Sequence, residues 1–164
     1  MKKLVTVLFL APLFAAAQDC KLNRETDPFT KETKLSTGFI NFDGGSVTID
    51  ADSKEINFLF SIEGADRCFD NNSTVDVYFE GIKSKTTTRS GGTMNCEGLF
   101  QLIFKNANTA PTTMLNRILT KKITQLIFTC NNGKQVTVTL GATEQQGLMT
   151  LANCLVTDAK TLIK

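Results

Sequence analysis

Histidine and tryptophan are absent from this 164-residue chain, and tyrosine occurs only once. Without histidine there is no Ser-His or Cys-His nucleophile pair, no histidine proton shuttle and no usual ligand set for a transition metal. Catalysis would have to rest on carboxylates, lysines or the one tyrosine. We therefore expect a protein that is not an enzyme, and the sequence nominates no catalytic, cofactor-binding or metal-binding residue.

Long apolar runs are also missing, apart from a short one at the N-terminus that has the pattern of a cleaved signal peptide. Lys2 and Lys3 form a basic region, residues 4–14 are apolar and residues 15–17 are alanines, so the mature chain is expected to begin at Gln18. The apolar run is too short to span a bilayer. The sequence predicts export to the periplasm or the medium, without stable membrane insertion.

A lipidated cysteine at the start of the mature chain is an alternative that Cys20 leaves open. The residue before it is Asp19, whereas a lipid-modifying peptidase needs a small neutral residue at that position. Cleavage after Ala17 without lipidation is therefore the favoured interpretation.

A charge excess of either sign is lacking in the mature chain. The whole sequence has 18 basic and 16 acidic residues, and removal of the signal peptide takes away Lys2 and Lys3. A near-neutral chain without a basic cluster has no electrostatic surface for nucleic acid or an anionic membrane. We expect neither as a partner.

Alternation of apolar and polar residues predicts antiparallel strands over most of the chain. The clearest case is 54–63, where four large apolar residues share one face. Residues 99–105 are apolar on both faces, which predicts a central strand, whereas 83–89 are polar with lysines and predict a solvated edge strand. The other predicted strands cover 35–42, 46–50, 74–82, 123–130 and 135–140, and turns are expected at 43–45 and 131–133.

Two helices are predicted in the second half of the chain. Thr143 and Gln146 form a Thr-x-x-Gln capping box, which opens an amphipathic helix to about Ile163. Pro111 fits the first turn of a short helix that ends near Leu119.

These elements predict an α+β fold with one domain over residues 35–164 and an N-terminal arm over residues 18–34. We expect an antiparallel twisted sheet or open barrel of about six to eight strands, with the C-terminal amphipathic helix packed on its apolar face. The predicted core consists of Ile56, Phe58, Phe60, Ile62, Val77, Phe79, Phe100, Leu102, Phe104, Leu126, Phe128, Val136, Val138, Leu148, Leu151, Leu155 and Leu162.

Five cysteines in an exported chain predict two disulfides and one free thiol. Cys68 and Cys96 lie in segments that can meet at one end of the sheet. Cys154 falls on the polar side of the last helix, where the arm that carries Cys20 can cross it. We therefore favour Cys68–Cys96 and Cys20–Cys154, with Cys130 as a buried thiol. A Cys130–Cys154 bridge, or mostly reduced cysteines, remain alternatives.

Two polar stretches resemble sites. The loop 63–73 is rich in Asp and Asn oxygens, which suit calcium, but it lacks EF-hand spacing and Arg67 is available to neutralise Asp66 or Asp70. Asp76 and Glu80 share a strand face and suggest a carboxylate pair. We favour a solvated loop for the first stretch and a solvent-facing strand for the second. The acidic stretch 50–55 receives the same interpretation, because Asp50 and Asp52 flank a predicted turn.

The sequence therefore supports one main functional hypothesis, an exported non-catalytic binding module. It would act by surface complementarity or by strand addition at an edge such as 83–89. The alternative is a carrier of a small apolar ligand, held between sheet and helix among the many phenylalanines. A carboxylate-based hydrolase is a remote third hypothesis. The sequence identifies no ligand, partner or oligomeric state.

Overall fold

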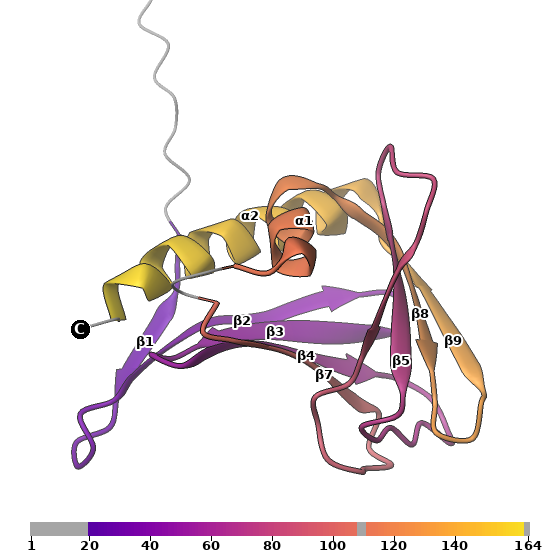
Figure 1. Cartoon of the computed structure of the whole chain (residues 1–164), viewed down its shortest axis with the longest axis horizontal. Helices are drawn as coiled ribbons and strands as arrows, with labels where there is room; N and C mark the ends of the chain where they lie inside the picture. Colours follow the sequence, from indigo (N-terminus) through magenta and orange to yellow (C-terminus); the bar gives the residue numbers. More distant parts are fainter. Residues whose placement is uncertain (1–19, 108–110, 163–164) are drawn as a thin grey trace, which may run out of the picture.

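The chain folds as an α+β protein with two antiparallel sheets and a C-terminal helix (Figure 1). The computed structural model describes residues 20–107 and 111–162, so the predicted signal peptide and the predicted helix end at Ile163 lie outside the described residues. The predicted class and the antiparallel pairing are confirmed. The predicted single sheet of about six to eight strands is corrected, because the nine strands of the described residues form two sheets, which are not closed into a barrel.

The first sheet has five strands in the order β1-β2-β3-β4-β7. It contains β1 (Asn23–Thr26), β2 (Thr33–Phe42), β3 (Gly45–Ala51), β4 (Glu55–Ile62) and β7 (Leu99–Lys105). Because β1 pairs with β2 over its whole length, part of the predicted N-terminal arm belongs to this sheet.

The second sheet has four strands in the order β6-β5-β8-β9. Its strands are β5 (Thr74–Phe79), β6 (Thr86–Arg89), β8 (Ile123–Thr129) and β9 (Gln135–Thr139). The predicted hairpin around residues 131–133 is confirmed, since β8 and β9 pair in register. In Figure 1 this sheet stands steeply across one end of the first sheet.

The helices are α1 (Thr113–Thr120) and α2 (Ala142–Ala159), which is followed by a 3-10 turn, η1 (Lys160–Leu162). The Thr112 hydroxyl caps α1 by accepting a hydrogen bond from the Leu115 amide at 3.2 Å. α2 contacts β2, β3 and α1, and it runs along the first sheet in Figure 1. The buried residues of α2 are Leu148, Ala152, Leu155, Val156 and Ala159.

The predicted capping box at the start of α2 is wrong. The helix begins two residues earlier than expected, so Gly141 is the N-cap in place of Thr143 and no side chain bonds there. Thr143 therefore lies inside the first turn, where its hydroxyl is not in the capping position. Gln145 donates from Nε2 to the Leu140 carbonyl at 2.7 Å, which ties the first turn to the preceding strand.

The prediction that residues 99–105 form a central strand is also wrong, because β7 lies at an edge of the first sheet. Ile103, on its second face, is half-buried because the backbone of Gly91 approaches it. The Gly91 amide donates to the Gln101 carbonyl at 2.9 Å. A loop, instead of a further strand, covers this edge.

An aromatic cluster joins the two sheets. Phe128 of β8 contacts Phe60 of β4, Phe69 of a loop and Phe100 of β7, with ring centroids between 5.2 and 6.1 Å apart. Each of these rings is almost fully buried, and burial of one such side chain stabilises the fold by about 1.5–3 kcal/mol. The predicted core is buried except for Val136, Leu151 and Leu162, which are half-buried.

Neither α1 nor α2, the two α-helices within residues 20–107 and 111–162, combines the length and the hydropathy of a membrane span.

Candidate functional site

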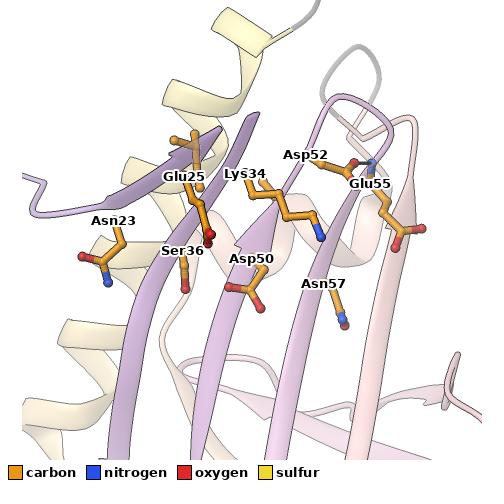
Figure 2. A pocket seen from close by; sticks show the side chains of 10 residues that line it. Asn23, Glu25, Lys34, Ser36, Asp50, Asp52, Glu55 and Asn57 are labelled. Atoms are coloured by element: carbon orange, nitrogen blue, oxygen red, sulfur yellow. Dashed lines mark hydrogen bonds between the residues drawn. The ribbon is translucent and has the colours of Figure 1, made fainter. Parts of the chain in front are cut away.

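The candidate site is a recess of about 410 Å³ over strands β1 to β4. It lies on the face of the first sheet that points away from α2, and we call this face the open face (Figure 2). Its side chains alternate along the strands with the buried core residues, as expected for a sheet with one covered face. The polar residues that line the recess are Asn23, Glu25, Lys34, Ser36, Asp50, Asp52, Glu55 and Asn57.

A polar row crosses four strands at the centre of this recess. Asn23 pairs with Ser36 and Ser36 with Asp50, and Asp50 in turn lies opposite Asn57. Neighbouring strands are about 4.8 Å apart, so these side chains stand side by side on one face. The row is therefore a continuous hydrogen-bonding surface on rigid elements.

Two acceptors in this row have no protein partner. The Asp50 carboxylate is half-buried, and it makes no hydrogen bond or ion pair with another residue of the described chain. Asn57 Oδ1 is a buried oxygen that likewise lacks a hydrogen-bond partner within residues 20–107 and 111–162. Buried polar atoms in proteins are normally paired, so Asn57 Oδ1 is an unsatisfied acceptor beside the solvent-accessible carboxylate of Asp50.

The charge of the recess is predominantly negative. Glu25, Asp50, Asp52 and Glu55 line it, against the single cation Lys34. Asp52 also shapes the turn between β3 and β4, because its Oδ1 accepts from the backbone amide of Glu55 at 2.8 Å. This part of the predicted turn at residues 50–55 is confirmed. The electrostatic field of the recess favours a cationic ligand.

The loop over residues 63–73, which resembled a calcium site, is held by its own side chains. Asp70 Oδ1 accepts from the amides of Asn72 and Ser73, each at 2.9 Å, which is an Asx turn. Asp66 lies 3.9 Å from Lys134, and Arg67 donates from Nε to the Glu63 carbonyl instead of pairing with either aspartate. No group of three or more acidic or cysteine side chains suited to a metal occurs among the described residues.

Asp76, the other predicted carboxylate, was expected to face the solvent. It is instead buried. Lys85 Nζ donates to it at 2.6 Å and Thr87 Oγ1 at 2.5 Å, because the β5–β6 hairpin folds over it. Burial opposes ionisation, but these two hydrogen bonds outweigh it and hold the pKa of Asp76 below its usual value. Glu80 is exposed as predicted, so the two carboxylates differ in environment.

The structure joins Cys68 to Cys96 and Cys20 to Cys154, the two pairs favoured from the sequence. Cys130 is a buried free thiol, and burial raises its pKa. This pairing replaces the alternative Cys130–Cys154 bridge, and it engages the Cys20 thiol that lipidation would require. The two disulfides indicate an oxidising environment.

A second recess, of about 680 Å³, lies along α2 beside the Cys20–Cys154 bridge and is lined by Gly147 and Leu151 among others. The predicted carrier would instead hold its ligand among the phenylalanines. Those rings pack against one another, and none of the cluster lines either recess.

Comparisons with known protein families, with curated proteins and with solved structures gave no match. The assignment of function therefore rests on the geometry of the recess.

The recess residues were missed as a site by reasoning from the sequence. The sequence predicts Asn57 within the strand 54–63 and Asp50 at the end of the strand 46–50, beside a turn, and both residues lie in strands. The short turn at Asp52–Lys54 fixes the register of Asp50 against Asn57. Ser36 lies opposite Asp50 because the register of β2 against β3 shifts between Ser36 and Phe39. The turn after Asp50 was a local signal, whereas the register shift was not.

Proposed function

We propose that this protein is a non-catalytic, exported binding module whose recess holds a ligand with an ammonium or guanidinium group. The observation that carries this proposal is the pair of unpartnered acceptors on adjacent strands, Asp50 and Asn57. An ionised donor pairs with the Asp50 carboxylate, beside the Asn57 side chain. Hydrogen bonds to charged groups contribute about 1.5–3 kcal/mol each.

The shape of the site supports binding instead of chemistry. The recess is shallow and open, and its acidic groups stand on a rigid sheet. In this proposal α2 packs on the apolar face of the first sheet, supported by its contacts with β2 and β3, and leaves the open face to the ligand. Export is supported by the predicted signal peptide over residues 1–17 and by the two disulfides.

Calorimetric titration of the mature protein with a lysine-rich peptide, an arginine-rich peptide and spermidine tests the proposal. We expect at least one of these cations to bind, with an affinity that falls as salt is raised, because screening weakens the attraction. The Asp50→Asn variant should bind at least about tenfold more weakly, the equivalent of about 1.4 kcal/mol.

The matched control is Asp43→Asn, which removes the same charge from an exposed turn outside the recess. Its affinity should equal that of the unmodified protein. Equal losses in both variants would mean that only the net charge matters, and absence of binding by all three cations would refute the proposed ligand class.

A further inference from the structure

The outer edge of β9 carries backbone groups that face away from the sheet. Cys130 donates to the Lys134 carbonyl at 2.8 Å and Leu140 donates to the Thr124 carbonyl at 3.0 Å. In an antiparallel ladder, hydrogen-bonded and non-hydrogen-bonded pairs alternate. The even-numbered residues of β9 therefore bond to β8, and Gln135, Thr137 and Thr139 direct their N–H and C=O groups outward.

This edge is open in the part of the chain that the structure describes. β9 is the last strand of the second sheet, and in Figure 1 its outer side faces away from the helices. Val136 and Val138 point to the core side, whereas Gln135, Thr137 and Thr139 are exposed. The strand has no charged residue and no proline, the two usual means of blocking an edge.

The edge formed by β7 is covered by the Asn95 side chain and by the loop that contains Gly91. Asn95 donates from Nδ2 to the Leu99 carbonyl at 2.9 Å, and its Oδ1 accepts from the Leu99 amide at 3.0 Å. Gly91 bonds to the carbonyl of Gln101, the next outward-facing residue. A further strand cannot pair with β7 without breaking these bonds.

The edges formed by β1 and β6 are protected by charge. β1 contains Arg24 and Glu25 in the middle of a short strand, so a copy of β1 centred on either residue would place like charges opposite each other. β6 carries Arg89 within the strand itself. Of the four strand edges formed by the described residues, β9 alone has neither covering bonds nor charge.

We propose that β9 pairs with β9 of a second copy of this chain, antiparallel and with the twofold axis at Thr137. Thr137 then lies opposite Thr137 of the second copy, and Gln135 lies opposite Thr139 of the second copy. All of these residues face outward, so each opposed pair exchanges both of its backbone hydrogen bonds. Val136 meets Val138 of the second copy on the core side, where β-branched pairs stabilise a sheet. The two four-stranded sheets become one continuous sheet.

In this register, each residue of β9 can lie opposite its partner residue in the second copy. Opposed residues are threonine, glutamine and valine, so no charge is buried and no like charges meet. The interface lies on the second sheet, away from the recess on the first sheet. Failure of dimerisation would therefore leave the proposed ligand site untouched.

Sedimentation equilibrium of the mature protein tests the proposal, with Thr137→Lys as the disrupting variant. This substitution puts two ammonium groups opposite each other at the axis but leaves the bonds to β8 intact. We expect a reversible dimer whose Kd rises at least tenfold in Thr137→Lys. Thr26→Lys, which adds the same charge to the exposed strand β1, should leave the Kd unchanged. Circular dichroism checks that both variants fold.

Cross-linking provides a second readout that does not depend on disruption. Thr137→Cys should give covalent dimers with a short bis-maleimide, because the two residues are about 5.5 Å apart between Cα atoms in a hydrogen-bonded pair. Thr26→Cys should not. A monomer at every concentration up to about 1 mM would overturn the proposal, as would equal behaviour of the variants at positions 137 and 26.

Discussion

Asp76 is a buried carboxylate whose charge is balanced by one neighbour on the same hairpin. Lys85 and Thr87 satisfy its two oxygens, and the ammonium of Lys85 remains half-exposed. Removal of the charge leaves Lys85 without its partner. The pair thus fixes the hairpin that carries β6 to the body of the second sheet.

We expect Asp76→Asn to lower the free energy of unfolding by about 1–2 kcal/mol at neutral pH, a value kept small because Lys85 is solvated. The pKa of Asp76 is lower in the fold than its usual 3.8, so its contribution is full above that value and is lost as the pH falls through the folded pKa. The difference between variant and parent should therefore shrink in acid. Urea unfolding across this range measures it, with Asp43→Asn as control. A difference that stays constant would contradict the linkage.

At the scale of elements, two glycines have opposite roles. Gly147 lies inside α2, and a Cβ there would meet no atom within 4 Å. Gly98 precedes β7 with a φ of +78°, and a Cβ there would meet the Ile62 carbonyl oxygen. Only the second position requires glycine.

Gly147→Ala should raise the free energy of unfolding by about 0.5–1 kcal/mol, because alanine loses less backbone entropy in a helix. Gly98→Ala should lower it, since both the φ and the close approach oppose a side chain. Chemical denaturation of the two variants, analysed at equal m-values, makes the comparison. A loss of stability in Gly147→Ala would show that this part of α2 is not a regular, open helix surface.

Strands and hairpins were predictable because their signals are local. The alternation over residues 54–63 and the turn at 131–133 depend only on near neighbours, and both β4 and the β8–β9 hairpin formed as expected. The position of β7 was not predictable in this way, because sheet order depends on contacts between distant segments. Its two apolar faces suggested a central strand, but the loop containing Gly91 supplied the cover instead.

The candidate site was less predictable than the fold. Asp50 and Asn57 belong to a recess only because of the register of three neighbouring strand pairs, which between β2 and β3 includes a shift between Ser36 and Phe39. A further shift of one residue in any pair would turn a member of the row to the other face. The burial of Asp76 was hard to predict for a similar reason, because Lys85 reaches it only through the pairing of β5 with β6.

At the scale of the whole molecule, two disulfides link segments that are far apart in sequence. Cys20 and Cys154 are 134 residues apart, whereas Cys68 and Cys96 are separated by 28. Together with the aromatic cluster around Phe128, they bind both sheets and α2 into one unit. In the chain-entropy view, a bridge that closes a longer loop removes more entropy from the unfolded chain.

Replacement of either pair by serines should therefore lower the free energy of unfolding by about 2–4 kcal/mol, with the larger loss for Cys20→Ser/Cys154→Ser. Pairwise replacement avoids an unpaired thiol, and Cys130→Ser provides a control that removes a buried thiol without a bridge. Equilibrium unfolding without reductant gives the values. Equal stability of the Cys20→Ser/Cys154→Ser variant and the parent would contradict a structural role for that bridge.

The bridge between Cys20 and Cys154 also constrains when this disulfide can form during synthesis of the chain. A chain is made from its N-terminus, so the first of these cysteines emerges long before its partner, and Cys68, Cys96 and Cys130 all appear in between. Correct closure can occur only after α2 has emerged. A nascent chain that stops short of α2 carries an unmatched Cys20, and such a fragment is exposed to wrong pairing with the inner cysteines. Formation of the correct bridge at Cys20 therefore depends on the presence of α2.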